Sequence, residues 1–441
     1  MESITQVAQE TQMILTTDAD RIAEETGFVR RRSKLGGAEF AQTLVLGWLN
    51  KPQASLGELT QTAAVGGVSI TPQGLDQRFT SQAADFLEHL LADAVERLVV
   101  SQPVCMPILQ RFSAVEIQDS SVIPLPEELA QVWQGCGNRA GRGNAALKVE
   151  VRWDLVSGSL TGPLLENGRV NEHVSQIQAQ SLPAGALRLA DLGYWGLKDM
   201  QTQAQAGVFW LSYFYPSTVV FDFQGHRLDM VKFLSHSTVS RFECQVFLGQ
   251  AYRLPVRLLV VRVPQEVADQ RRRRLHERAQ RLQKPVSQRS LDLAEWTLLV
   301  TNIPAEKLTL REALVLIRIR WQIELLFKLW KSHGLIDEWR SGKPWRILCE
   351  IYAKLLAMLI QHWLFVISAW STVDRSLIKA AQTIQRFALI LLSCLSEIQK
   401  LEETMKVIQR CLSFGCRLNK SRKSPRLFQL LLALEESETL V

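Results

Sequence analysis

Hydrophobic and polar positions change their period along the chain, and each change predicts a different kind of element. Residues 1–110 carry amphipathic runs with apolar residues three and four positions apart, which is typical of helices. From about residue 111 apolar and polar residues alternate, as expected of strands with one buried face. Such runs cover residues 114–118, 146–155 and 159–165. The last two are joined by Val156, Ser157 and Gly158, and together they predict a hairpin.

Short strands are predicted up to about residue 215, and a different pattern of apolar and polar residues follows. Residues 185–192 predict a strand ending in Asp191, with a helical run from Leu197 and an apolar strand at residues 208–214. The alternation of strand and helix then stops. Four strand-like runs follow at residues 219–222, 230–234, 242–248 and 256–263. Residues 216–290 are therefore predicted to be rich in β-structure, ending in an arginine-rich helical run at 265–283.

An amphipathic helix is predicted over residues 318–331, and from there the chain reads as almost entirely helical. Ile319, Ile323, Leu326, Phe327 and Trp330 form its apolar stripe. Its charged flank consists of Arg320, Glu324, Lys328 and Lys331. Alone, this flank favours ordinary i,i+4 ion pairs on the surface of a helix. The most apolar stretch, residues 355–370, is short for a bilayer span and predicts a buried helix, with no membrane partner.

Composition narrows the class of partner and the compartment. A chain of 441 residues predicts several domains, and its net charge of +7 favours a polyanionic partner such as nucleic acid. The seven dispersed cysteines form no Cys-x-x-Cys pair, which predicts reduced intracellular thiols rather than disulfides or a zinc site. The first residues have no basic segment followed by an apolar run, so we expect no signal peptide.

The sequence leaves two interpretations open for the pair of short N-terminal helices and two for the arginine-rich run at residues 265–283. Ser55 with Glu58 predicts a capping box, and Thr71 before Pro72 predicts a second helix start. This pair of short helices is compatible with a helix-turn-helix and equally with a small bundle without a DNA role. The arginines of residues 265–283 form either a solvated helix face or a phosphate-binding face.

Three carboxylates stand at positions where they could form one site. Asp119 and Asp191 each end a predicted strand, where the active sites of α/β folds gather. Glu324 lies on the helix at 318–331. Carboxylate oxygens suit Mg²⁺ or Mn²⁺, and a pair of such ions supports phosphodiester chemistry. Clustered carboxylates without cations would repel one another.

Four motifs in order resemble the transposases of bacterial insertion-sequence family 4, a DDE group. Arg320, Glu324 and Lys331 match the spacing of that family's Tyr-x-x-Arg-x-x-x-Glu-x-x-x-x-x-x-Lys signature. Asp119, in Ile-Gln-Asp-Ser-Ser, and Asp191, in Asp-Leu-Gly-Tyr-Trp, resemble its two aspartate motifs. The tryptophan strand of the family is matched by Trp-Thr-Leu-Leu-Val-Thr, which starts at residue 296. The resemblance covers roughly residues 30–370.

The resemblance implies an α/β fold, with an RNase H-like core interrupted by a β-rich insertion and flanked by helical N- and C-terminal regions. The expected parts are a helical DNA-binding region, the first part of the core, the insertion, the second part of the core and a helical C-terminal region. Their expected bounds are residues 1–110, 111–215, 216–290, 291–345 and 346–441.

The resemblance also implies the activity and its residues. Asp119, Asp191 and Glu324 would hold two Mg²⁺ or Mn²⁺ ions for cleavage at a transposon end, and the freed 3′-hydroxyl would attack target DNA. Arg320 and Lys331 would contact phosphates. Trp296 would stack on a base flipped out of the duplex.

One position departs from the signature, and it bears on one step of the reaction. Where the family has tyrosine, this chain has Ile317, which cannot hydrogen-bond a terminal phosphate. The phosphate contact, and the hairpin step that some members use, are therefore placed in doubt, whereas the metal ligands are all present.

The expected partners are terminal inverted repeats and target DNA, bound by a homodimer in the bacterial cytoplasm at the nucleoid. Two alternatives are compatible with the same motifs. One is a metal-dependent nuclease domesticated from such a transposase. The other is a catalytically silent DNA-binding protein, against which the complete Asp-Asp-Glu set argues.

Overall fold

The computed structural model describes residues 4–31, 34–137, 143–423 and 425–438. Its residues form two compact units, each built from segments that are distant in the sequence. Unit 1 comprises Met1–Gln110, Asp119–Ala179 and Trp321–Gln429. Unit 2 comprises Arg111–Gln118, Gln180–Arg320 and Leu430–Val441.

The strands form a sheet whose first five members have the order of an RNase H-like core. Strand β1 (Val115–Pro124) passes from unit 2 into unit 1. In unit 1 it is followed by the antiparallel hairpin of β2 (Ala146–Asp154) and β3 (Leu160–Asn167). In unit 2 it pairs in parallel with β4 (Leu187–Ala190), which pairs in parallel with β5 (Phe209–Tyr213). The strand order is thus β3-β2-β1-β4-β5.

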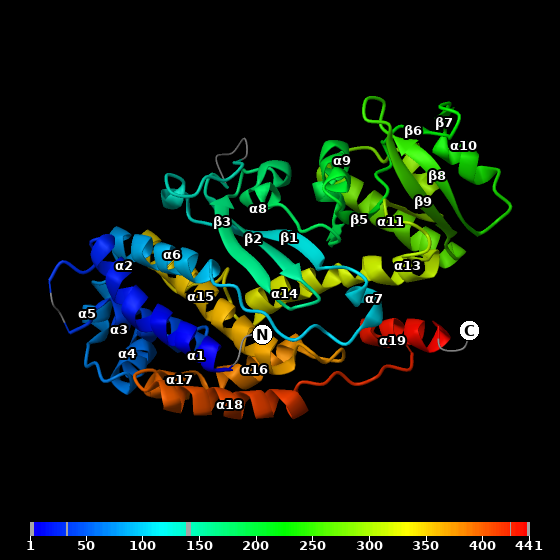
Figure 1. Cartoon of the computed structure of the whole chain (residues 1–441). Coiled ribbons are helices and arrows are strands. Elements are labelled where there is room, and N and C mark those ends of the chain that lie inside the picture. Colours follow the sequence, from blue (N-terminus) through cyan, green and yellow to red (C-terminus); the bar gives the residue numbers. More distant parts are fainter. Residues whose placement is uncertain (1–3, 32–33, 138–142, 424, 439–441) are drawn as a thin grey trace. The chain divides into compact units, whose positions relative to one another are not determined.

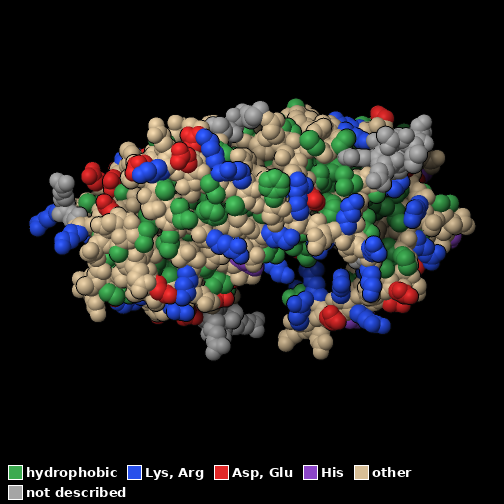
Figure 2. Space-filling view, turned by 90° about the horizontal axis from the view of Figure 1, so that it is seen from below, with side chains coloured by type: hydrophobic (Ala, Val, Ile, Leu, Met, Phe, Trp, Pro, Cys, Tyr) green, Lys and Arg blue, Asp and Glu red, His purple; other side chains and the backbone are tan. Residues whose placement is uncertain are grey.

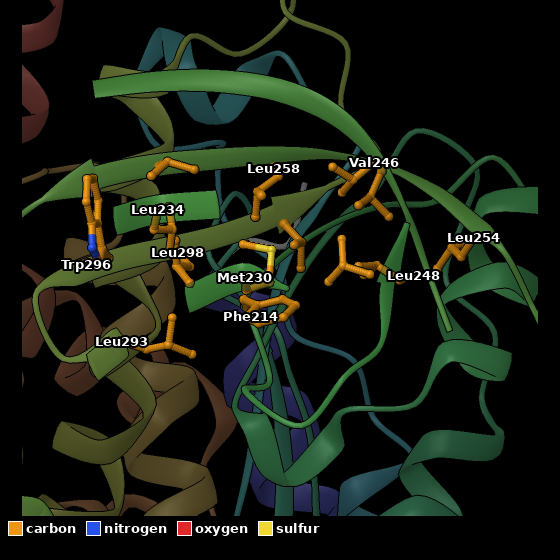
Figure 3. Packing of buried hydrophobic residues seen from close by; sticks show 14 of the residues in the cluster. Phe214, Met230, Leu234, Val246, Leu248, Leu254, Leu258, Leu293, Trp296 and Leu298 are labelled. Carbon is orange, nitrogen blue, oxygen red and sulfur yellow. The ribbon is translucent and has the colours of Figure 1, made fainter. Parts of the chain in front are cut away.

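The remaining strands of unit 2 form the insertion and its return to the core. Their order from β5 outward is β10-β9-β8-β6-β7. They are β6 (Val220–Phe221), β7 (Arg227–Leu228), β8 (Arg241–Leu248), β9 (Leu254–Arg262) and β10 (Trp296–Thr301). Strand β10 is antiparallel to both β5 and β9. Figure 3 shows the hydrophobic cluster that joins these strands, with Met230, Leu258 and Leu298 among its members.

One predicted strand of the insertion is wrong. Residues 230–234 lie in the helix α10 (Met230–Ser235). The Asp229 carboxylate caps this helix by accepting hydrogen bonds from the backbone N–H groups of Val231 and Lys232. Met230 and Leu234 lie on its buried face, at the four-residue spacing of a helix. The other helices of unit 2 are α9 (Leu197–Gln205), α11 (Gln265–Leu282), α12 (Gln288–Leu293) and α13 (Leu310–Ile319), with a 3₁₀ turn at Leu192–Tyr194.

Unit 1 is mainly helical, and α15 (Pro344–Ala369) is its central helix. It packs against α3 (Gly37–Asn50), α6 (Ser81–Val95) and α18 (Ile398–Gly415), as Figure 1 shows. By length and composition α15 could cross a membrane, but 89% of its most apolar window is buried, which is the environment of a core helix. The N-terminal helices are α1 (Ile4–Met13), α2 (Ala19–Glu25), α3 (Gly37–Asn50), α4 (Leu56–Val65), α5 (Pro72–Asp76), α6 (Ser81–Val95) and α7 (Pro107–Gln110). The others are α8 (Gln176–Ala179), α14 (Trp321–Ser332), α16 (Leu377–Gln385), α17 (Ala388–Cys394) and α18 (Ile398–Gly415).

Helix α19 (Leu427–Glu438) is the last helix of the described residues, and three further short helical turns lie between the longer elements. A π-helical turn at Ile14–Asp18 lies between α1 and α2, and 3₁₀ turns lie at Glu127–Leu129 and Glu172–Val174.

The fold class predicted from the sequence is confirmed: a mixed α/β protein with an RNase H-like core, a β-rich insertion and helical terminal regions. Both predicted helix starts in the N-terminal region are also present. The Ser55 hydroxyl accepts a hydrogen bond from the Glu58 N–H, and Thr71 caps α5 ahead of Pro72. The division into five segments, and the DNA role of residues 1–110, stay predictions.

Candidate active site

The two aspartates follow equivalent positions on neighbouring parallel strands. In the register of β1 and β4, Gln118 is paired with Ala190. Asp119 comes directly after Gln118, and Asp191 comes directly after Ala190. Asp119 is partly buried, and its Oδ1 accepts a hydrogen bond of 2.8 Å from the Ser120 N–H. The Asp191 side chain is 51% exposed and stands at the start of a 3₁₀ turn.

Arg320 lies beside Asp191 within unit 2. Its Nη2 is 3.9 Å from Asp191 Oδ1, and its side chain is only 13% exposed. The single helix predicted over residues 318–331 is divided at this residue, since α13 ends at Ile319 and α14 begins at Trp321. Arg320 keeps helical backbone angles, and its N–H donates to the Arg318 carbonyl, two residues back. The structure therefore brings together the predicted phosphate-binding arginine and the second aspartate.

Glu324 and Lys331 both lie on α14, in unit 1. Glu324 is in the first turn, where the partial positive charge of a helix N-terminus favours a carboxylate. Lys331 is in the last turn, with its Nζ 3.7 Å from Asp337 Oδ2. The same Nζ donates a hydrogen bond of 3.5 Å to the Val122 carbonyl, three residues after Asp119. Lys331 thus links α14 to the part of β1 that carries the first aspartate.

The donor chemistry of these carboxylates fits a hard divalent cation. Asp119, Asp191 and Glu324 offer only oxygen ligands, which Mg²⁺ and Mn²⁺ prefer. Across the residues that the structure describes, no three His, Cys, Asp or Glu side chains are grouped so that they could hold a metal ion.

Trp296 begins β10 and belongs to the hydrophobic cluster of unit 2. It is 8% exposed, and Figure 3 shows it at one end of the cluster. The Arg262 guanidinium lies 5.5 Å from the centre of its ring, within the range of a cation–π contact. Arg271 donates a hydrogen bond of 2.8 Å to the Trp296 carbonyl. Stacking of this tryptophan on a DNA base stays a prediction.

An aromatic pair near Asp191 was missed by the sequence interpretation. Trp195 stacks on Tyr215 with ring centres 6.1 Å apart, and Tyr215 is 44% exposed. Trp195 also makes an edge contact with Phe214. The spacing along the sequence gave no signal for this pair, because its members come from segments 20 residues apart that the fold brings together.

Ile317, at the tyrosine position of the signature, is a core residue. Its side chain is 3% exposed on the buried face of α13, which packs on β5. The substitution of an apolar residue is therefore compatible with the local packing. A phenol at this position would have to displace neighbouring side chains or place its hydroxyl among them.

We expect Ile317→Tyr to destabilise the protein by about 1–3 kcal/mol, because added volume in a packed core forces side chains off their preferred rotamers. Urea unfolding followed by circular dichroism measures the change. The volume-conserving Ile317→Leu should cost less than about 1.5 kcal/mol. A tyrosine variant as stable as the wild type would mean that the pocket accepts the residue of the signature.

The fold and the carboxylates define an α/β protein with an RNase H-like core and with aspartates directly after the paired positions Gln118 and Ala190 of two parallel strands. A comparison with protein families matches residues 112–360 to the family described as "Transposase DDE domain". The chain belongs to this family of DDE transposases. Membership makes the protein a DNA-cleaving and DNA-joining enzyme, of a class that depends in general on divalent metal ions.

Individual relatives agree with the family match. The chain is 27% identical over 365 residues to the transposase for insertion sequence element IS231C of Bacillus thuringiensis subsp. berliner, with 77% of this chain and 75% of the relative covered. It is 22% identical over 370 residues to the transposase for insertion sequence element IS1151 of Clostridium perfringens, with 78% and 76% covered. These matches do not favour a domesticated nuclease or a silent DNA-binding protein.

Proposed function

We propose that the protein cuts DNA at the ends of an insertion sequence and joins the freed 3′-hydroxyl to target DNA, using Asp119, Asp191 and Glu324 as the ligands of two Mg²⁺ or Mn²⁺ ions. Such ions, when bound, activate the attacking oxygen and stabilise the leaving oxygen in phosphodiester chemistry. The protein's own part is to supply three oxygen ligands and to hold the DNA strand in line. The Tyr-Arg-Glu-Lys signature group is part of this proposal.

The register of β1 and β4 carries the proposal. Gln118 is paired with Ala190 on parallel strands, so the residues that follow them come directly after neighbouring positions, although β4 ends at Ala190 and β1 runs on to Pro124. Asp119 and Asp191 are those residues. The hydrogen bond from Lys331 to the Val122 carbonyl supports the placement of α14, and with it Glu324, next to β1.

The DNA-contacting residues are proposed from their positions around these carboxylates. Arg320, 3.9 Å from Asp191, would bind a phosphate next to the cut and keep the aspartate side chain oriented before DNA binds. Lys331 would offer a second positive charge at the other end of α14. Trp296 would take up a flipped base, after its ring is released from the contact with Arg262.

The wider setting of the reaction is proposed on the same basis. Both ends of a mobile element must be held together, so we infer a homodimer in the DNA complex, acting in the bacterial cytoplasm at the nucleoid. Residues 1–110 would bind the terminal inverted repeats. Figure 2 shows Lys and Arg side chains distributed over one face, as suits a polyanionic partner for a protein with a net charge of +7.

A cleavage and joining assay tests this function. Purified protein is incubated with a duplex that carries the element's end and with target DNA, in Mg²⁺, in Mn²⁺ and in excess chelator. We expect cut and joined products only with a divalent ion, and their loss in Asp191→Ala. Equal activity of Asp191→Ala would contradict the assignment of the site. Cleavage without joining would show a nuclease.

A further inference from the structure

The arginines of α11 fall into two groups: two contact residues around the start of β10, and four are exposed. Arg271 points inward: its Nη1 donates to the Trp296 carbonyl and its Nη2 to the Thr297 hydroxyl, each at 2.8 Å. Burial lowers the pKa of this arginine from its usual value. Arg272 contacts Asp269 at 3.0 Å and Glu295 at 2.6 Å. These two residues fix α11 against the start of β10, which carries Trp296.

The other four arginines of the helix point away from this anchor. Arg273, Arg274, Arg278 and Arg281 are all exposed. Arg274, Arg278 and Arg281 are four and three residues apart, so they share one face and form a row about 10 Å long. Within the part of the chain that the structure describes, none of these four guanidinium groups has a carboxylate within ion-pair distance.

Among the described residues, the exposed row has no ion pairs through which it could stabilise α11. Like charges four residues apart on a helix repel by a few tenths of a kcal/mol, and these side chains form no ion pair that offsets this cost. Helix α11 carries six arginines against three acidic residues, and one of those acids, Asp269, is already bound to Arg272. By contrast, Lys400 and Lys406 on α18 pair with Glu397 and Glu402.

Charge complementarity identifies the partner of this face. Duplex DNA carries one negative charge per about 1.7 Å of its axis, so a row of about 10 Å can face several phosphates at once. Arginine is suited to this contact because its planar guanidinium binds phosphate oxygens in pairs. Arg271 of the same helix donates a hydrogen bond to the Trp296 carbonyl, which fixes the helix that carries the row to the strand that carries a proposed DNA contact.

We propose that the exposed arginines of α11 bind the phosphate backbone of duplex DNA, forming a second, sequence-independent contact beside the Trp296 strand. The inference rests on the proposed function for DNA as the partner. It does not depend on which carboxylates carry out the chemistry. The contact would hold the duplex against unit 2 whichever sequence is bound.

The salt dependence of DNA binding tests the proposal. The full-length protein and a variant with Arg273, Arg274, Arg278 and Arg281 all changed to Gln are titrated with an end-containing duplex and with an unrelated duplex of equal length, from low to high salt. Each phosphate contact contributes about 0.9 to the slope of log K against log salt. We expect the slope of the variant to fall by about 2–4 on both duplexes, with affinity at least tenfold weaker at low salt.

Two matched variants separate charge at this site from charge in general. Changing Arg386, Lys400, Lys406 and Arg410 to Gln removes four exposed positive charges from unit 1, and should change the slope by less than about 1. Changing the four α11 arginines to Lys keeps the charge and should keep most of the slope. Circular dichroism confirms that each variant is folded.

The outcomes distinguish this inference from the proposed function. An unchanged slope in the glutamine variant of α11, or an equal loss in the unit 1 control, would overturn the α11 contact even if the wild type cuts DNA in an Asp191-dependent way. A loss confined to the end-containing duplex would overturn the sequence-independent contact, and an equal loss on both duplexes would support it. Absence of Asp191-dependent cleavage with a reduced slope would overturn the proposed chemistry and leave the α11 contact supported.

Discussion

Glu324→Gln is expected to lower the rate of DNA strand cleavage about a thousandfold or more. Loss of a charged metal ligand removes several kcal/mol of transition-state stabilisation, and about 4 kcal/mol corresponds to a factor of a thousand. Glutamine keeps the size of the side chain and its helix propensity, so α14 should still form between Trp321 and Ser332. Single-turnover cleavage of an end-containing duplex in Mg²⁺ measures the effect.

The matched control for this variant is Glu403→Gln, which removes the same charge from an exposed position on α18. It should cleave at the rate of the wild type. The affinity of Glu324→Gln for the duplex in the absence of divalent ions should not fall by more than a few-fold. The change removes a negative charge near DNA, which does not weaken the binding of a polyanion. A normal cleavage rate in Glu324→Gln, in an assay where Asp191→Ala is inactive, would remove Glu324 from the site and leave the two aspartates.

Local sequence signals identified most elements of the fold. The capping residues Ser55 and Thr71 mark helix starts because their hydroxyls satisfy backbone N–H groups that have no partner within the helix. The alternation in β2 and β3 with Gly158 between them identified the hairpin. Such signals depend on neighbours in the sequence, and they hold wherever local geometry decides the outcome.

The misassigned elements are those where local signals were ambiguous or absent. Residues 230–234 are a short apolar run that suits either a strand or a buried helix turn, and the Asp229 cap decides for the helix. The sequence has no glycine or proline at Arg320 that would predict the break between α13 and α14. The backbone of Arg320 stays helical, with φ −47° and ψ −33°, so only the hydrogen-bond pattern changes there.

The polar positions of β2 also differ from what the alternation suggests. A polar face on an antiparallel strand usually meets water, yet Lys148 is 3% and Glu150 0% exposed. Lys148 Nζ lies 2.9 Å from Glu150 Oε1 and also donates to the Val170 carbonyl. Arg152 donates to the Ile177 carbonyl of α8. The segment after β3 covers this face, and no feature of β2 itself could predict that cover.

The candidate site needed long-range information of the same kind. The sequence predicted a strand end at each aspartate, which is right for Asp191 and wrong for Asp119, because β1 continues to Pro124. The pairing of Gln118 with Ala190 is a register between strands some 70 residues apart. The contact of Arg320 with Asp191 joins residues 129 positions apart. Motif spacing in a family carries such information indirectly, because the spacing is kept where the fold requires it.

Acid is expected to destabilise unit 1 through His362, a buried residue of α15. The imidazole Nε2 lies 2.9 Å from the Gly158 carbonyl at the hairpin turn, and the ring makes an edge contact with Trp153. Burial, together with the nearby charge of Arg375, lowers the pKa of His362 to about 4. The folded protein therefore binds the proton less well than the unfolded chain, whose histidine pKa is about 6.5.

The sign and window of the effect follow from this difference. Above about pH 6.5 the imidazole is neutral in both states, and the full stability is present. As the pH falls from about 6.5 toward 4, the unfolded chain gains a proton that the folded protein excludes, so stability is lost. A shift of this size corresponds to about 2–3 kcal/mol between pH 7.5 and pH 4.5.

The variant His362→Gln isolates this term, because its amide can still donate to the Gly158 carbonyl but does not titrate. Urea unfolding of both proteins at pH 7.5 and pH 4.5 gives the comparison. Burial raises the pKa values of Glu88, Glu150 and Glu350, so these residues act in the opposite direction, since stability falls as pH rises through their range. Their contributions are common to both proteins and cancel. The wild type should lose about 2–3 kcal/mol more than the variant between the two pH values, and equal losses would mean that His362 takes up a proton inside the folded unit.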